Sequence, residues 1–379
     1  MIRKALRLSA SLVLAASGLA LGRADPRPPG GEPPPLVAAE PPVGDSDPPA
    51  PDPTSAPETA PAPRPVDDSL PKTLAEQRRA LFHTLEAELD LAAAQLASVE
   101  QVFEASPVLG QGNPAVARHG MKRSECRRAR AEAGLPAFSE SHPPCDRRNM
   151  VPLYDPDAGE TVADARVCID QFEFPDVACE YPVVHVTARE AAELCAAEGK
   201  RLCDAHEWEG ACAGALHTPE VEYAFGLPRP LATFRHNKDR ERVWAYGPRK
   251  DHTRCATGMP KTVGCLGGGW GQCGSNTYPA GSFPGCVSAF GVYDQHGNAA
   301  EHMSLPLSPA ELGSRGGTGA TEMKGSWFVF QREEAHEDDC RWRAKDWHPS
   351  KVMAVESHSN YHLGFRCCAD LDPGDDTDR

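Results

Sequence analysis

The sequence is short of positive charge and of long apolar runs. Its 379 residues include 39 Lys and Arg against 54 Asp and Glu, which gives a net charge of −15. A nucleic-acid partner requires clustered basic side chains to neutralise its phosphates, so this balance argues against nucleic-acid binding. Apart from residues 8–21, no stretch is apolar enough to span a bilayer, which excludes a membrane-embedded bundle.

Several motifs that would assign a catalytic class are also missing. The glycine-rich run 267–271 has no Lys-Ser or Lys-Thr after it, so it is not a phosphate-binding loop, and there is no nucleophile elbow. His206 and Glu207 do not begin a His-Glu-x-x-His zinc motif, because residue 210 is glycine. No Cys-x-x-Cys pair has a matching second pair, which argues against a zinc cluster.

The N-terminus has the pattern of a secretory signal peptide. Three basic residues precede the apolar run 8–21, and Gly22 and Ala24 are small residues that fit a cleavage site after Ala24. Residues 1–24 are therefore interpreted as a signal peptide, although an uncleaved anchor remains the alternative. Cleavage would leave no transmembrane span and would place the protein in the periplasm, outside the cell or on its surface. In such compartments the 14 cysteines are expected to form disulfides.

Residues 25–69 are predicted to be a disordered linker rich in Pro, Ala and acidic residues. Sixteen of the 37 prolines lie between Pro26 and Pro65, and residues 25–68 contain no aromatic side chain. Such a segment cannot bury enough apolar area to offset its chain entropy. A spacer is the simplest interpretation, and a proline-rich ligand for a partner is the alternative. Residues 372–379 are predicted to be an acidic tail.

Residues 70–106 are predicted to form one amphipathic helix, because apolar residues recur at helical spacing from Leu74 to Phe103. Its apolar stripe could pack on the following domain, pair two copies through residues 74–103, or lie on a membrane. Residues 107–144 are predicted to be a connector containing a short basic helix within residues 118–130. That helix is interpreted as a solvated face, with an acidic partner as the alternative.

Residues 145–371 combine short β-branched stretches, many glycines and 13 of the 14 cysteines. Thr187 and Glu190 form a capping-box pattern for a helix that ends near Gly199, and a second short helix is predicted over residues 204–212. The remainder is typical of short strands and long loops. An α+β, loop-rich domain held together by disulfides is therefore expected.

Several ordered motifs in this region resemble the sulfatase-modifying factor family, whose best-known member is the formylglycine-generating enzyme. The matching blocks are residues 184–202, 207–212, 223–226, 290–301, 324–327, 340–343 and 363–367. The resemblance implies a C-type-lectin-like fold over residues 145–371. It also implies two disulfides by family position, Cys195–Cys367 and Cys212–Cys340. The other ten cysteines are not assigned, although Cys265 and Cys273 flank one loop and are candidates to pair.

The copper chemistry of that family is not expected here. The family motif places two cysteines after Gly-Ser-Trp/Tyr, and these positions are Val329 and Glu334 in this chain. Neither side chain replaces a thiolate on Cu(I). Ala300 stands at the position of the family tryptophan that lines the oxygen pocket, and His362 stands at the position of a substrate-contacting asparagine. Whether the protein binds iron is left open. Four histidines lie near four carboxylates in the sequence, but their spacing fits no ligand motif, so they are interpreted as a wet surface loop. The residues are His336, His348, His358, His362, Glu333, Glu334, Asp338 and Asp339.

Calcium is the cofactor that the family resemblance supports. Asp294, Gly297, Ala299 and Glu301 occupy the family's ligand positions at unchanged spacing. Carboxylate and carbonyl oxygens suit this hard cation. The alternative is that Asp294 and Glu301 only cap the turn at Gly297 and Asn298. A second family calcium site would involve Asn237.

The resulting hypothesis is an exported, non-catalytic binding or structural module with a structural calcium. By family position, Ser326, Trp327, Arg343 and His362 line the former active-site cleft and would contact an unidentified protein or an envelope ligand. The alternative is an oxygen-dependent oxidoreductase of the formylglycine-generating or non-haem-iron type, with relocated metal ligands. A third hypothesis is an envelope scaffold in which the 74–103 helix pairs chains.

Overall fold

The computed structural model describes residues 67–136, 140–345, 348 and 350–371. The predicted signal peptide, almost all of the predicted linker and the acidic tail therefore lie outside the described residues. The described residues all belong to one compact unit, Pro63–Arg379. No helix among them has both the length and the apolar character needed to cross a membrane.

The segment expected to form one long helix forms two, α1 (Leu74–Glu88) and α2 (Ala93–Ala105). A capping box between Thr73 and Glu76 starts α1. The helix ends because Asp90 adopts a left-handed backbone with φ 53°, which cannot continue an α-helix. The Asp90 carboxylate then pairs with Arg148 at 2.6 Å. The single helix was therefore a wrong prediction, since an apolar periodicity can continue across a turn.

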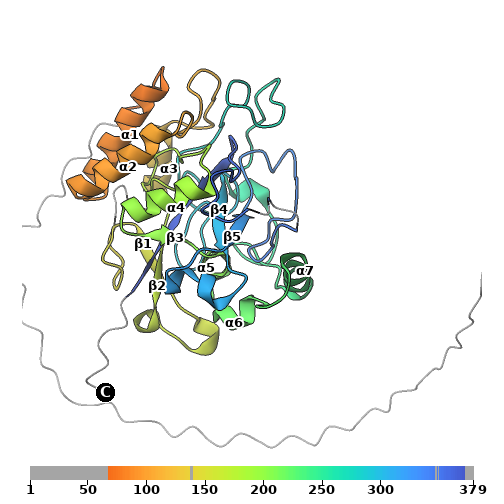
Figure 1. Ribbon diagram of the computed structural model, residues 1–379. Helices are drawn as coiled ribbons and strands as arrows, with labels where there is room; N and C mark the ends of the chain where they lie inside the picture. The colour runs from red at the N-terminus through yellow and green to blue at the C-terminus, as the bar shows by residue number, and fades with distance from the viewer. Residues whose placement is uncertain (1–66, 137–139, 346–347, 349, 372–379) are drawn as a thin grey trace, which may run out of the picture. The chain divides into compact units, whose positions relative to one another are not determined.

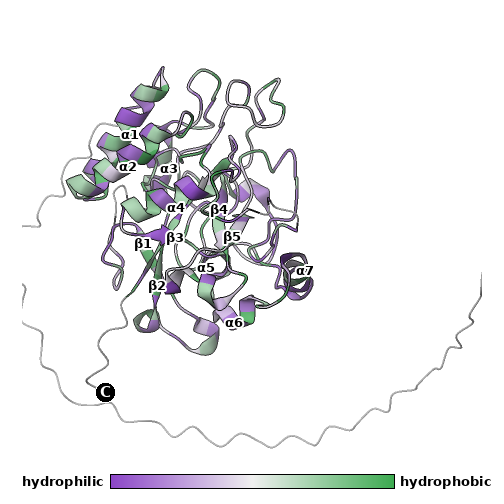
Figure 2. Cartoon of the chain, in the orientation of Figure 1, coloured by the Kyte–Doolittle hydropathy of each residue, from purple (hydrophilic) through white to green (hydrophobic). Residues whose placement is uncertain are grey.

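The apolar faces of α1 and α2 are covered within the chain. Leu81, Leu85, Val99 and Phe103 are at most 2% exposed and share one core with Leu194 of α4 (Ala188–Ala197). Figure 1 shows α1 and α2 side by side next to α4, and Figure 2 shows hydrophobic and hydrophilic residues interleaved along both helices. Of the three expected arrangements, the apolar stripe of α1 and α2 packs on the following domain. Self-association through residues 74–103 stays a prediction.

The basic helix, α3 (Arg123–Glu132), is less solvated than expected. Arg123 forms an ion pair with Glu180 at 2.6 Å, and the Arg130 guanidinium lies over the rings of Phe172 and Tyr293. Arg130 is only 3% exposed. The interpretation of a solvated basic face is therefore wrong for these two arginines, which anchor the connector to the domain.

Two small sheets form the centre of the domain. One has the order β1 (Met150–Leu153), β2 (Val167–Asp170), β7 (Cys367–Asp370), β3 (Arg201–Leu202), with antiparallel neighbours. The other has the order β5 (Ala320–Lys324), β4 (Ala300–Leu305), β6 (Leu363–Phe365), and β4 pairs with β6 in parallel. Only Arg366 separates β6 from β7, so one extended segment joins the two sheets.

Short helices and long loops complete the α+β fold. Besides α1, α2 and α3, the α-helices of the described residues are α4, α5 (Ala205–Ala213), α6 (Pro219–Glu222) and α7 (Arg229–Asp239). Thr187 and Glu190 form the expected capping box of α4. Five 3₁₀ turns lie in the loops: Pro156–Ala158, Val162–Asp164, His252–Arg254, Pro309–Glu311 and Gly313–Arg315. This leaves much of the chain without hydrogen-bonded ladders, so other constraints must order it.

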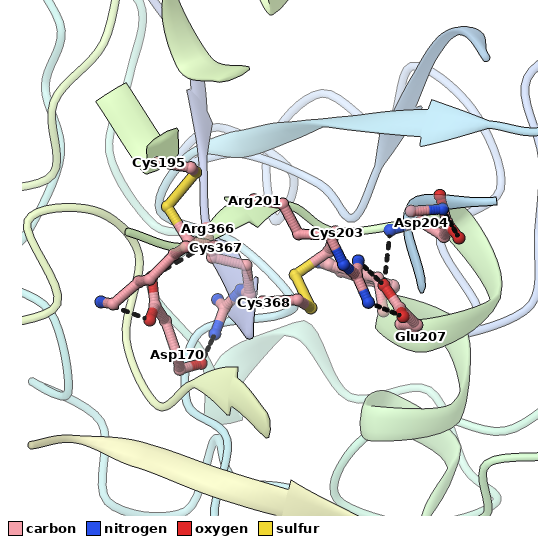
Figure 3. Close-up of a disulfide and its surroundings, with 12 residues drawn as sticks. Asp170, Cys195, Arg201, Cys203, Asp204, Glu207, Arg366, Cys367 and Cys368 are labelled. Carbon is pink, nitrogen blue, oxygen red and sulfur yellow. Dashed lines mark hydrogen bonds and ion pairs between the residues drawn. A yellow bond between two sulfur atoms is a disulfide. The ribbon is translucent and has the colours of Figure 1, made fainter. Parts of the chain in front are cut away.

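Seven disulfides supply those constraints, and they use all 14 cysteines. Both pairs implied by the family resemblance are present, as is the pair that closes the glycine-rich loop. Cys367 and Cys368 are adjacent on β7 and point to opposite faces, so one bonds α4 and the other bonds Cys203 (Figure 3). The seven pairs are Cys126–Cys179, Cys145–Cys168, Cys195–Cys367, Cys203–Cys368, Cys212–Cys340, Cys255–Cys286 and Cys265–Cys273.

The packing of α2 on the domain can be tested with Phe103→Ala. This side chain is fully buried and stacks edge-on with Phe82 at 5.2 Å between ring centroids. Its loss should lower the free energy of unfolding by about 3–5 kcal/mol. Leu70→Ala is the control, because Leu70 is 54% exposed and should change stability little. Equal denaturation midpoints for the two variants would contradict this packing.

Candidate functional site

The Arg366 guanidinium lies between the two sheets and holds Glu301. Its Nε and Nη2 atoms donate to Glu301 Oε2 and Oε1, both at 2.7 Å, and its other hydrogen bonds go to the carbonyls of Asp170, Gln171 and Tyr293. The Trp208 indole also donates to Glu301 Oε2 at 3.0 Å. Glu301, an expected calcium ligand, therefore has both oxygens engaged by protein donors.

Glu173 lies near Glu301 and Asp294, and these three residues form a carboxylate cluster. Glu173 accepts hydrogen bonds from the Asn298 side chain at 2.5 Å and from the Ala299 amide at 2.7 Å. Burial raises the pKa of Glu173 well above its ordinary value, and the nearby Asp294 and Glu301 carboxylates raise it further. The sequence analysis did not select Glu173. Its signal was a carboxylate between two phenylalanines, in a segment that is otherwise typical of a buried core.

Asp294 is the member of the cluster with an open ligand atom. Its backbone is left-handed at φ 58°, and its Oδ2 accepts from the Gly281 amide at 2.5 Å. Its Oδ1 is buried and makes no hydrogen bond among the described residues. Burial raises the pKa of Asp294 to about 6. Because the partners of Asp294 and Glu301 lie outside the 297–298 turn, these carboxylates do not act as caps of that turn.

The cluster has the oxygen donors of a hard-cation site, but it is not one of the groups of described residues that bring three ligand atoms within 4.8 Å of one another. Glu173, Asp294 and Glu301 are all buried, and the Arg366 guanidinium is bonded to Glu301. The cluster offers carboxylate oxygens, which are the donors that calcium prefers. Gly297 approaches the Ala256 carbonyl so closely that an added Cβ would lie 2.7 Å from its oxygen. This glycine keeps the turn between Asp294 and Glu301 tight.

Two of the four expected cleft residues line a cleft together. A cavity of about 520 Å³ is bordered by Trp327, His336, Trp342, His362 and Met323, and we call it the aromatic cleft. Trp327 stacks on His362 at 4.3 Å between ring centroids, and His336 stacks on Trp342 at 4.5 Å. Glu337 and Lys345 also border this cleft. Sequence reasoning missed Trp342 and the placement of His336.

Ser326 and Arg343, the other two expected cleft residues, lie elsewhere. The Ser326 hydroxyl is buried and accepts a hydrogen bond from the Gly297 amide at 3.0 Å. Arg343 binds both oxygens of Glu209 at 2.8 Å, and Lys324 reaches the same carboxylate at 2.9 Å. Burial alone would raise the pKa of Glu209, but Arg343 and Lys324 hold it below its ordinary value. Both predicted cleft contacts are therefore corrected to structural roles.

Neither residue at the positions of the family's copper-binding cysteines can supply a thiolate. Val329 is fully buried in an apolar core, and Glu334 forms an ion pair with Lys250 near the surface. Ala300, at the position of the oxygen-pocket tryptophan, is also fully buried. Cys340 is bonded to Cys212. The surroundings of Val329, Glu334 and Ala300 therefore differ from the family's copper and oxygen sites in the structure as well as in the sequence.

The histidines that were interpreted as a wet surface loop divide into different environments. His336 and His362 border the aromatic cleft, whereas the rings of His348 and His358 stack on each other at 4.1 Å. Asp338 is buried and accepts from His252 at 3.0 Å. Burial lowers the pKa of His362 well below its ordinary value, with further lowering by nearby histidines. The surface interpretation is therefore wrong for the two cleft histidines.

A larger cavity of about 620 Å³ lies beside α6 and α7, and several of its charged groups are paired. Glu222 binds Arg341 and His217, and the His236 ring bonds the Arg341 carbonyl at 2.7 Å. Glu220, Arg235 and Asp239 also line this cavity and make no side-chain hydrogen bond or ion pair among the described residues, so the cavity keeps unpaired charged groups. The aromatic cleft is the candidate site that contains two of the expected cleft residues, Trp327 and His362.

The comparison with protein families identifies the class of this domain. The model of the sulfatase-modifying factor enzyme 1-like domain matches residues 160–371, more than half of the chain. The chain therefore belongs to this family. It is a divergent member, because Val329 and Glu334 replace the copper-binding cysteine pair. The loop-rich α+β domain accordingly has the C-type-lectin-like fold expected from the sequence.

Among solved structures, PvdO from Pseudomonas aeruginosa is similar to this chain, with 22% sequence identity and a TM-score of 0.28. The match covers 50% of this chain and 62% of that one, so the chain spans less than two thirds of the length of this relative. Identity and TM-score at this level are too low to transfer a function.

The structural role of Arg343 can be tested with Arg343→Met. Removal of the guanidinium leaves the Glu209 carboxylate buried with Lys324 as its remaining ion-pair partner, which should cost about 3–5 kcal/mol of unfolding free energy. Arg128→Met is the control, because Arg128 has a side chain that is 68% exposed. Chemical denaturation measures both. An Arg343→Met protein as stable as the control would return Arg343 to the list of possible ligand contacts.

Proposed function

We propose that this protein is an exported binding module of the sulfatase-modifying factor family, with a structural calcium and no copper oxidase activity. The observation that carries the proposal is the composition of the former active-site region. The aromatic cleft keeps Trp327 and adds three further rings, while Val329 and Glu334 stand at the positions of the thiolates. A cleft with stacked rings and no soft metal ligands suits recognition better than oxygen chemistry.

The rival is an oxidoreductase with relocated metal ligands. The described residues contain four places where three His, Cys or carboxylate ligand atoms lie within 4.8 Å of one another. None of the four includes His336, His348, His358 or His362, and two of them use cysteines that are bonded in disulfides. This distribution supports the binding module over an iron enzyme centred on those histidines.

Export is supported by the disulfides. Seven disulfides that use every cysteine are typical of proteins folded in an oxidising compartment. Together with the N-terminal pattern of residues 1–24, they favour secretion to the periplasm or beyond.

Metal analysis of the protein purified under oxidising conditions tests the choice between binding module and oxidase. We expect about one equivalent of calcium for the single proposed site, and neither copper nor iron near stoichiometry. Oxygen uptake with cysteine-containing peptides should stay at the level of the buffer. A full equivalent of copper or iron that is accompanied by oxygen uptake would overturn the proposed function in favour of the oxidoreductase.

The calcium proposal makes a prediction with a definite pH dependence. The pKa of Asp294 is raised from 3.8 to about 6, so its contribution to stability is present below pH 3.8 and is lost as the pH rises through about 6. A cation offsets the ionised carboxylates. Calcium at 100 times its Kd should therefore stabilise the protein by about 2.7 kcal/mol at pH 7.5, and clearly less at pH 5. Differential scanning fluorimetry measures the shift.

Asp294→Asn is the variant that isolates this site. Its amide oxygen can still accept from the Gly281 amide, and asparagine tolerates the left-handed backbone. We expect no calcium response, and a melting temperature without calcium that is at least that of the wild type at pH 7.5. Glu132→Gln, with a side chain that is 73% exposed, is the control and should keep the response. A calcium response that survives Asp294→Asn would place the cation elsewhere.

A further inference from the structure

One histidine and two aspartates from separate segments converge beside the larger cavity. His217, Asp155 and Asp157 each offer one ligand atom, and these three atoms lie within 4.8 Å of one another. The Leu216 amide donates to the Tyr154 carbonyl at 3.0 Å, which aligns the segment after α5 with the segment after β1. This hydrogen bond joins the residues directly before His217 and Asp155, so the backbone brings the two side chains together.

A hydrogen bond to Glu222 determines which nitrogen of His217 faces the aspartates. Its Nδ1 lies 2.9 Å from Glu222 Oε1, and the Glu222 carboxylate is itself held by Arg341. Because a carboxylate accepts, Nδ1 carries the proton, and the neutral ring keeps a lone pair on Nε2. That Nε2 lies 3.9 Å from Asp157 Oδ2. A carboxylate behind the ring is the usual way in which a metal-binding histidine is oriented.

The two aspartates have carboxylate oxygens that no cation holds. Asp155 Oδ1 accepts from the Asp157 and Ala158 amides, while Asp155 Oδ2 makes no hydrogen bond in the described part of the chain. Glu160 adds a third carboxylate, which accepts from the Asp155 amide at 2.8 Å. Among the described residues, no Lys or Arg forms an ion pair with any of these three carboxylates, and His217 is the only basic group near them. This local excess of negative charge favours a bound cation.

The other groups of converging ligand atoms differ in this respect. Two of the four groups contain cysteines that are bonded in disulfides. In a third, Lys and Arg side chains already hold both carboxylates, Glu209 and Glu222. Of the four groups, only that of His217 has ligand atoms that neither a disulfide nor a basic side chain already occupies.

The mixture of donors selects the class of cation. Imidazole nitrogen suits zinc and its neighbours among the transition metals, whereas calcium takes oxygen ligands. Ligand atoms around a tetrahedral zinc lie about 3.4 Å apart, so His217 Nε2 and Asp157 Oδ2 have to approach by only about 0.5 Å. The Asp157 side chain is 79% exposed and can rotate to do so.

We propose that His217 Nε2 and the carboxylates of Asp155 and Asp157 bind a divalent transition-metal ion, for which zinc is the probe. Three protein ligands leave a fourth position to water or to another ligand. His217 also lines the larger cavity, which puts the ion at the edge of that cavity. This site goes beyond the proposed function, because neither the carboxylate cluster nor the aromatic cleft includes these residues.

The test titrates zinc into tag-free, disulfide-bonded protein that has been freed of metals. Isothermal titration calorimetry is run at pH 7.5, with and without millimolar calcium. We expect one equivalent of zinc to bind, with a Kd that calcium does not change, since imidazole is not a calcium ligand.

Three variants and one control connect the binding to named side chains. Asp157→Asn and His217→Gln each remove one ligand and should raise the Kd for zinc about tenfold or more. Glu222→Gln changes only the group behind the histidine and should raise the Kd about tenfold. Asp239→Asn is the matched control, because Asp239 is an exposed aspartate that lines the same cavity outside the group of ligands. Melting temperatures establish that each variant is folded.

The outcomes decide this inference separately from the proposed function. Absence of saturable zinc binding, or competition by calcium, would overturn the transition-metal site. An unchanged Kd in both Asp157→Asn and His217→Gln would place the ion elsewhere and overturn it as well. None of these results bears on the copper, iron and oxygen-uptake measurements, which alone decide between binding module and oxidase.

Discussion

The ion pair between Arg366 and Glu301 is the contact on which the rest of the domain depends. Arg366 is the single residue between β6 and β7, so its position couples the two sheets, and its partner Glu301 lies on β4. The next two residues, Cys367 and Cys368, bond α4 and the segment before α5. One short segment thus carries the sheet junction, a buried charge pair and two covalent links. A loop-rich chain with few ladders needs such a junction to keep one arrangement.

The same ion pair also affects the carboxylates beside the turn at Gly297. Arg366 neutralises one carboxylate of the cluster, and Glu173 and Asp294 remain buried with raised pKa values. Burial and mutual repulsion disfavour the ionised form of both carboxylates, and the proposed calcium would offset that cost. The Ser326 hydroxyl joins the turn at Gly297, and the next residue, Trp327, borders the aromatic cleft. The carboxylate cluster and the aromatic cleft are therefore neighbours through the consecutive residues Ser326 and Trp327.

Much of the fold could be predicted from the sequence, because spacing and motif order carry it. Cys195 and Cys212 paired as the family positions imply, and the capping box at Thr187 began α4. The break at Asp90 was not predictable from apolar periodicity, since a single left-handed residue interrupts a helix without altering the pattern. The site was predicted less well. Arg343 could not be placed without knowing that Glu209 is buried beside it, and Glu173 becomes conspicuous only when Asp294 and Glu301 surround it.

The central claim is that the region of the family's active site serves binding in this chain and holds neither copper nor iron. The most direct measurement is X-ray diffraction from crystals of the protein purified from its native host, recorded at the copper and iron absorption edges. The claim predicts no anomalous copper or iron peak in the aromatic cleft. An anomalous copper or iron peak within coordination distance of His336 or His362 would contradict it.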